Sequence, residues 1–318
     1  MDDEPLSLLR LGLVALLNIA LAVVLGAVVS QALMGPEMSA WAAKRRQSLS
    51  RSAYAGLAVL ITVEVLRIWV QAAVLSEMPL HRAFGSIDAF LTRTHAGRAS
   101  AAGLVVLLIP VGVSMARGRR QGGLLTMGLC AIGFAASRSW SGHAGVSGDV
   151  VPFATDWLHV VGTGVWAGVV VLAAFVVLPP SSPAGADDRA AGAAYVGWLS
   201  TTATWALVIV LLTGAGSAWW GLGSGSVPIF TSSWAVILMI KLVLVAVAVA
   251  SGAYNRFSVL PRLISGLRFP SPQTDGSFKK FTAVLVVEAF VLLAVEVAAA
   301  ALSTSAPPPA VTFIHSID

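Results

Sequence analysis

The sequence predicts an all-α membrane protein, a bundle of eight transmembrane helices, and two observations support that prediction. Of its 318 residues, 57% are hydrophobic and only 11% are charged, whereas a soluble domain has about 25% charged residues. Eight apolar segments are also long enough to cross a bilayer, which takes roughly 20 residues each. They lie approximately at residues 6–33, 53–75, 97–116, 122–140, 153–178, 196–220, 233–254 and 280–302.

The loops between these segments are too short to form a soluble domain, so residues 1–318 are predicted to form a single membrane domain. Residues 6–120 hold the first three spans, and residues 121–309 hold the other five. The first apolar segment follows an acidic start and is longer than the apolar part of a typical signal peptide, so we expect a retained span. The longest loops are 34–52, 76–96, 179–195 and 255–279.

Positive charges are unevenly distributed between the two sides of the predicted bundle. The loops on one side hold thirteen Lys and Arg residues, and the other side holds five. Because short loops rich in Lys and Arg stay in the cytoplasm, both termini are predicted to lie on the opposite, outer side. The net charge of +5 therefore reflects membrane topology and does not indicate a nucleic-acid partner. All five histidines then fall on or near the outer side: His81, His95, His143, His159 and His315.

One stretch, residues 141–168, combines a membrane span with polar side chains. Four residues at spacings of 3, 4 and 3 fall on one face of a helix, namely Asp156, His159, Thr163 and Trp166. His159 lies about 10 Å inside the outer end of this span. Ionisable groups inside a membrane mark functional sites by default, and neutral imidazole is the commonest metal ligand. The stretch therefore predicts a functional site walled by Trp166.

Other ionisable residues lie within the spans and need partners, because an unpaired charge in the membrane is costly. Glu64 and Arg67, three residues apart, are expected to pair locally. Lys241 is expected to pair with Glu288 or Glu296 of the neighbouring span. Glu296 lies roughly 9 Å from the outer end of its span. Such pairs either lock the helix packing or form the floor of the metal site.

Several motifs follow one another in the order typical of one family. GHA, then D-x-x-H, then W-x-G seven residues on, occur within residues 142–168. LLTGAGSAWW, IKLVLVAVAVASGAYNRFSVLPRL and VEAFVLLAVEVAAAALSTSAPPP come next. This order resembles the CopD copper-resistance and copper-uptake membrane proteins over about residues 137–309. The likeness is weaker over the first three spans, where THAGR at 94–98 is similar to the family's start of span three.

The resemblance implies an eight-span protein of the bacterial inner membrane that takes up or relays copper from the periplasm. It implies His143 and His159 as metal ligands and Asp156 as a supporting carboxylate, and His95 is a further candidate. In this arrangement the ring N–H of His159 would donate to Asp156. The implied partners are the copper ion, the lipid bilayer, a periplasmic copper-binding donor and, for a homo-oligomer, a second copy of the chain. Imidazole and carboxylate suit Cu(II), but Cu(I) stays open.

Two other functions stay open at this point. Two of His95, His143 and His159 on facing helices could hold one outer-side haem, as in a membrane cytochrome. Alternatively, the chain is a structural subunit whose intramembrane charges only hold its helices together. Enzymatic activity is not expected, because the sequence has no H-E-x-x-H, no G-x-S-x-G and no P-loop. The single cysteine, Cys130, excludes a disulfide framework.

Overall fold

The fold consists of helices throughout the described part of the chain. The computed structural model describes residues 4–34, 39–117, 123–142, 149–178, 185–222, 233–269 and 272–305. Within these residues, eight helices of 19 or more residues coincide with the eight predicted spans, which confirms the all-α class. They are α1 (Glu4–Leu33), α2 (Ala40–Ser76), α4 (His95–Arg117), α5 (Gly123–Ser141), α7 (Val150–Leu172), α8 (Ala186–Leu222), α9 (Ser233–Tyr254) and α11 (Thr274–Thr304).

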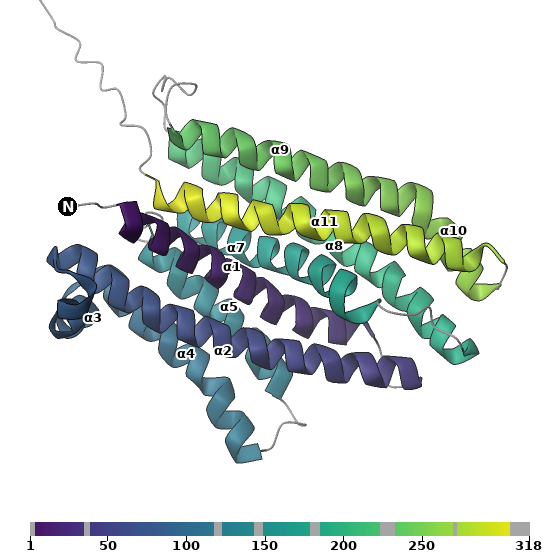
Figure 1. Cartoon of the computed structure of the whole chain (residues 1–318), viewed down its shortest axis with the longest axis horizontal. Coiled ribbons are helices and arrows are strands. Elements are labelled where there is room, and N and C mark those ends of the chain that lie inside the picture. The colour runs from purple at the N-terminus through teal and green to yellow at the C-terminus, as the bar shows by residue number, and fades with distance from the viewer. Residues whose placement is uncertain are drawn as a thin grey trace, which may run out of the picture.

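Successive long helices run in opposite directions through one bundle (Figure 1). The beginning of α1 and the end of α11 lie at the same end of it, as expected for eight crossings. Seven of the described helices are long and apolar enough to span a membrane, and α5 is the predicted span outside that set. Its 19 residues end in the polar run Ser-Arg-Ser-Trp-Ser. The chain is therefore a polytopic membrane protein, and the side on which its termini lie stays a prediction.

Two predicted loops, 34–52 and 179–195, are largely helical in their described parts, so these predicted boundaries are wrong. Helices α2 and α8 each begin inside such a loop and are 37 residues long. Ser39 caps α2 by accepting a hydrogen bond from a backbone N–H of the first turn. The backbone N–H of Trp41 donates to Oδ1 of Asp188 over 3.0 Å. The two helix starts thus stabilise each other beyond the apolar spans, which hydropathy alone does not indicate.

Shorter helices connect or extend the long ones at both ends of the bundle. The 3-10 helix η1 (Leu80–Ser86) and α3 (Ile87–Arg93) connect α2 to α4. A π-helical turn, η3 (Asn255–Val259), connects α9 to α10 (Leu260–Arg268). Pro261 explains this π turn, because proline has no N–H to donate and its ring clashes with the carbonyl four residues back. The helix therefore widens before Pro261.

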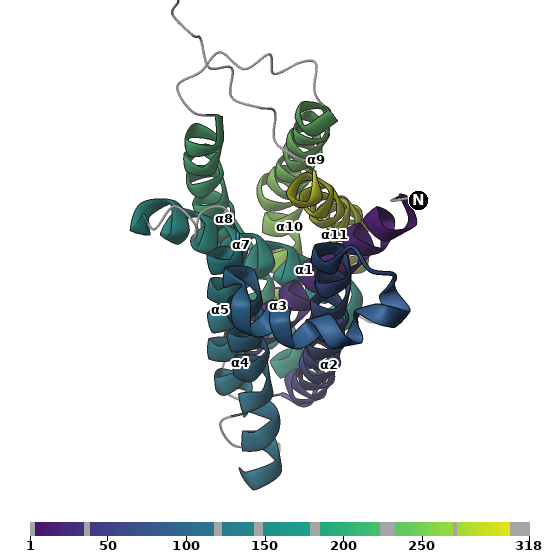
Figure 2. The ribbon, with the colours of Figure 1, turned by 90° about the vertical axis from the view of Figure 1, so that its left-hand side faces the viewer.

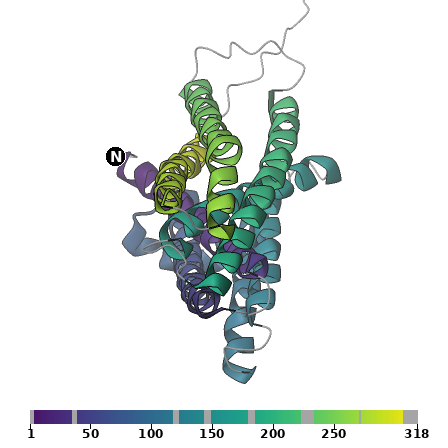
Figure 3. The ribbon, with the colours of Figure 1, turned by 90° about the vertical axis from the view of Figure 1, so that its right-hand side faces the viewer.

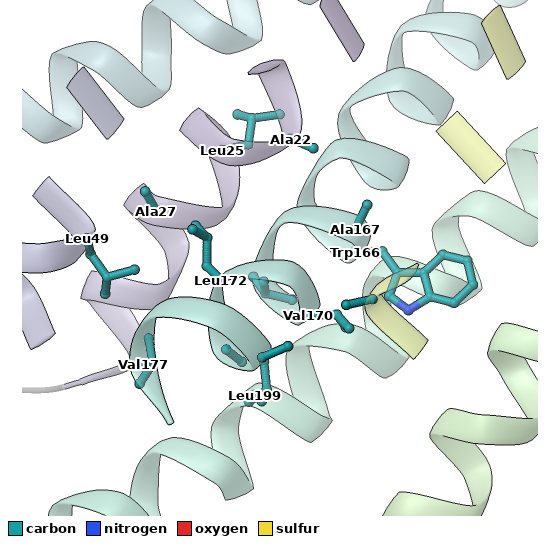
Figure 4. Close-up of a cluster of buried hydrophobic side chains, with 14 of the residues drawn as sticks. Ala22, Leu25, Ala27, Leu49, Trp166, Ala167, Val170, Leu172, Val177 and Leu199 are labelled. Atoms are coloured by element: carbon teal, nitrogen blue, oxygen red, sulfur yellow. The ribbon is translucent and has the colours of Figure 1, made fainter. Parts of the chain in front are cut away.

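The core of the bundle lies where α7 packs against α1. A Cβ added to Gly168 of α7 would lie 2.9 Å from Cα of Gly26 of α1, so the two backbones are in direct contact. Gly164 and Gly168 are four residues apart, the small-residue spacing that allows such close packing of membrane helices. Side chains of α1, α2, α7, α8 and the π turn η2 (Ala173–Val177) surround this contact (Figure 4), including Ala22, Leu25, Leu49, Trp166, Leu172, Val177 and Leu199.

Helices α8 and α9 lie apart from each other. Helix α8 packs on α7, and α9 packs on α11. Views from the two opposite ends of the bundle show α8 and α9 as separate arms (Figures 2 and 3). In the span that contains α9, only 11% of the most apolar window is buried, the smallest share of the seven. Its outward apolar face is therefore a lipid-facing surface.

Candidate metal site

The predicted polar face of residues 156–166 lies on α7, which is helical throughout this stretch. The hydroxyl of Thr163 donates to the backbone carbonyl of His159 over 2.8 Å, one turn earlier. Trp166 is 2% exposed and belongs to the hydrophobic core, where its ring lies on the side of α7 away from α1 (Figure 4). Trp166 is thus a packing residue two helical turns from His159, and His159 and Asp156 are the half-buried polar groups of this face.

The imidazole of His159 is oriented by α8. Its Nδ1 lies 3.1 Å from the hydroxyl oxygen of Thr213. That hydroxyl has a single proton, and it donates this proton to the carbonyl of Ile209 over 2.6 Å. We therefore assign the ring proton to Nδ1, with the oxygen of Thr213 as its acceptor. Neutral His159 then has a free lone pair on Nε2, which is the arrangement found in metal-ligating histidines.

This arrangement corrects one detail of the sequence analysis. Asp156 was expected to accept the ring N–H of His159, whereas the structure gives that role to Thr213. The reason is the packing of α8, which places a hydroxyl directly against the ring. Asp156 lies one turn earlier on α7 and acts on His159 only through its charge.

Glycine on α8 allows the ring to lie in this position. A Cβ added to Gly214 would lie 3.2 Å from Cε1 of His159, a tighter contact than a side chain normally makes. Two residues further along α8, a Cβ on Gly216 would lie 3.1 Å from Cγ2 of Thr155, which precedes His159 by about one turn of α7. The small residues of α8 therefore let its backbone approach α7 near His159.

Polar side chains from α1, α5, α9 and α11 form a network near the same end of the bundle. Nη1 of Arg138 donates to Oδ1 of Asn18 over 2.7 Å, and Nδ2 of Asn18 donates to the backbone carbonyl of Glu296 over 3.4 Å. The carboxyl group of Glu296, 4% exposed, interacts electrostatically with Lys241 and Arg138. Both of these cations also interact with Asp156 of α7. We call these five residues the outer polar network.

Two expected charge pairs have clear outcomes. Glu64 is fully buried and forms a two-pronged ion pair with Arg67, with N–O distances of 2.6 and 2.8 Å, so this pairing is confirmed. Of the two carboxyl groups proposed for Lys241, Glu296 is the one with which Lys241 interacts. Within the described residues, no charged side chain has a comparable electrostatic interaction with the carboxyl group of Glu288.

The other outer histidines have different surroundings. His95 begins α4, and its ring centroid lies 5.7 Å from that of Trp140 on α5. Its Nδ1 is buried and has no hydrogen-bond partner among the described residues. His81 is exposed in η1. His143 and His315 lie outside the described residues.

The predicted ligand set of His95, His143, Asp156 and His159 is not assembled in the described part of the chain. There, no group of three or more His, Cys, Asp or Glu side chains is close enough to hold a metal ion. His95 contacts α5, whereas His159 contacts α8, so these two side chains belong to different helix interfaces. His159 is thus the described residue best prepared for a metal, and metal binding by the set stays a prediction.

Sequence reasoning missed the roles of Thr213 and Arg138. Arg138 was one of the five cations counted on the outer side, although it lies inside the apolar segment 122–140, and that position was the available signal. In the structure it is half-buried in the last turn of α5 and bonded to α1. Thr213 carried no signal beyond being a small residue, because its role depends on which helix packs against His159.

Comparison with known families identifies the chain. Residues 1–151 match the family model of the copper resistance protein D-like N-terminal domain, and residues 193–302 match that of copper resistance protein D. Together the two matches cover most of the chain. The chain belongs to the copper resistance protein D family. A search of curated proteins found no match, and a search of solved structures found none either.

Membership in the copper resistance protein D family connects this membrane protein with copper and confirms the resemblance seen in its motifs. The second match includes Thr213 and the intramembrane residues Lys241, Glu288 and Glu296. The polar face of α7 lies between the two matched ranges. The role of His159 therefore depends on the geometry of this chain and not on the family match.

Proposed function

We propose that this protein binds copper at the outer end of its bundle and passes it inward across the membrane. The single observation behind this proposal is the hydrogen bond between Nδ1 of His159 and Thr213, which in the assigned tautomer leaves the lone pair of Nε2 free. Copper is the substrate here, and imidazole is one of its preferred ligands. Asp156, one turn away, supplies a carboxylate near the same position, and imidazole together with carboxylate favours Cu(II).

The outer polar network lies near the same end of the bundle as this ligand and supports a route past it. Lys241 acts electrostatically on His159, on Asp156 and on Glu296. A copper ion leaving His159 would therefore pass acidic and basic side chains of this network before it reached the inner half of the bundle. His143, which follows α5 in the chain, and His95 are the candidates to complete the ligand set. The proposed setting is the bacterial inner membrane, with a periplasmic copper-binding protein as donor and no enzymatic step.

Copper stoichiometry tests this proposal. The full-length protein is purified in detergent, loaded with copper, desalted and analysed for metal by mass spectrometry. We expect about one copper ion per chain in the wild type and none in His159→Ala, because a site that loses its leading imidazole loses its affinity. His81→Ala and His315→Ala are the controls and should keep the copper.

Equal copper content in wild type and His159→Ala would contradict the site. No copper in any variant would contradict the proposed function itself. The visible spectrum of the same samples then separates the two alternatives, because a membrane cytochrome would show a Soret band and a structural subunit would be colourless.

Thr213→Val tests how His159 is oriented. Valine has nearly the shape of threonine but cannot accept the Nδ1 hydrogen bond, so the ring is free to change tautomer. We expect the copper affinity to fall about 10–100-fold, the usual effect of removing the partner of a ligating histidine. Thr201→Val is the matched control, because Thr201 makes the same kind of bond to a backbone carbonyl of α8, Thr201 Oγ1 to Gly197 O. Isothermal titration with copper measures both affinities, and equal losses in the two variants would contradict a specific role for Thr213.

A further inference from the structure

Glu288 of α11 is a buried carboxyl group without a partner. It is 4% exposed and lies near the middle of α11. Among the described residues it has neither a hydrogen bond nor an ion pair, and no charged side chain acts on it appreciably. Glu64 and Glu296, the other buried glutamates, both interact with cations. A carboxylate in this position needs a compensating positive charge, because an isolated one is very unfavourable in an apolar medium.

A second unpartnered oxygen lies in the same helix interface. Asn255, at the start of η3, is 4% exposed, and its Nδ2 donates to the backbone carbonyl of Phe281 over 3.3 Å. A carbonyl oxygen accepts only from a donor, so this contact fixes which end of the amide is nitrogen. Oδ1 of Asn255 is therefore the opposite atom, and it is buried with no hydrogen-bond partner in the described part of the chain.

Glu288 and Asn255 both lie in the interface of α9 with α11. A Cβ on Gly252 of α9 would lie 3.0 Å from Oε1 of Glu288, so the carboxyl group rests on the backbone of α9. Asn255 follows three residues later, on the same side of that helix. The two helices run antiparallel and side by side (Figure 1). Side chains of a helix point toward the N-terminus of that helix. In these antiparallel helices, the side chain of Glu288 therefore points along the bundle toward the level of Asn255, and that of Asn255 toward the level of Glu288.

We propose that Glu288 and Asn255 form a binding site for a monovalent metal cation of the sodium type, within the membrane domain and separate from the copper site. The two groups offer a carboxylate and an amide oxygen, and oxygen ligands suit hard cations, whereas soft Cu(I) prefers sulfur. A single carboxylate balances one positive charge, whereas a divalent ion would leave an excess charge in an apolar medium. Gly252 lets the carboxylate lie directly against the backbone of α9.

The position of the site agrees with this assignment. Intramembrane carboxyl groups that face a helix interface commonly mark ion pathways, and π turns such as η3 are frequent at functional sites. Arg256, the next residue, does not occupy the site, because its guanidinium donates to Ser200 and Thr204 of α8. The inference stands independently of the copper proposal, since it involves neither His159 nor the outer polar network.

Binding of radioactive sodium to the purified full-length protein tests this inference. We expect about one sodium ion per chain, together with a higher melting temperature in sodium chloride than in choline chloride at equal ionic strength, because a ligand that binds only the folded state stabilises it. Glu288→Gln keeps the side-chain shape but removes the charge, and it should abolish both effects. Asn255→Ala, which keeps the carboxylate, should weaken sodium binding about tenfold.

Glu296→Gln is the matched control, since Glu296 lies on the same helix and is equally buried but interacts with Lys241 and Arg138. It should keep the sodium effect. Lithium and potassium chloride in the same assay show which monovalent ion fits best. The inference is overturned if the wild type binds none of the three ions and its melting temperature matches that of Glu288→Gln, which would show that Glu288 is simply a protonated carboxyl group. Copper content, measured on the same samples, reports separately on the copper proposal.

Discussion

Gly168→Ala is expected to lower the stability of the bundle by about 1–3 kcal/mol, the usual effect of overpacking. The new methyl group would collide with the backbone carbonyl of Ala22 and lie 2.9 Å from Cα of Gly26. Backbone atoms cannot move aside as the end of a side chain can, so α1 and α7 must separate. Separation also opens the core around the contact, and a larger residue such as leucine at position 168 should prevent stable folding.

Thermal unfolding in detergent, followed by tryptophan fluorescence, measures this effect. Gly12→Ala is the matched control, because Gly12 also lies in a long helix and a Cβ there would meet nothing within 4 Å. It should be neutral or slightly stabilising, since alanine favours a helix by up to about 1 kcal/mol over glycine. Equal melting temperatures for the two variants would show that the contact of α1 with α7 is looser than described.

Arg67→Leu should have a still larger effect, a loss of about 3–5 kcal/mol, because it leaves the fully buried Glu64 without its cation. Arg67 also donates to the hydroxyl of Ser100 over 2.7 Å, so the guanidinium joins α2 to α4. Its removal therefore weakens a contact between these helices as well as an ion pair within α2.

The double variant Glu64→Leu with Arg67→Leu distinguishes an unpaired charge from a general packing defect. Replacing a whole buried ion pair by apolar groups is often neutral or stabilising, so the double variant should melt at a higher temperature than Arg67→Leu alone. The same thermal assay applies. If the two changes were additive, the pair would not interact as the distances indicate, and the loss would have to come from packing.

The sequence by itself determined the fold class and the spans of this protein. Apolar length, the 3.6-residue period and the order of the motifs are local properties, and each can be read without knowing which helices are neighbours. The same kind of reasoning placed Asp156 and His159 on one face of α7 and paired Glu64 with Arg67, because residues three or four apart in a helix must be close. These expectations hold in the structure.

Only the tertiary structure decided which residues meet across helices. Thr213 reaches His159 from 54 residues away, and Asn18 bonds to the backbone of Glu296 across 278 residues. It also decided that Lys241 interacts with Glu296 and leaves Glu288 without a cation. Several apolar helices of similar length can be packed in many orders, and hydropathy does not distinguish them. Close contacts such as that of Gly26 with Gly168 select the packing order, because only residues without a side chain let two helix backbones approach so closely.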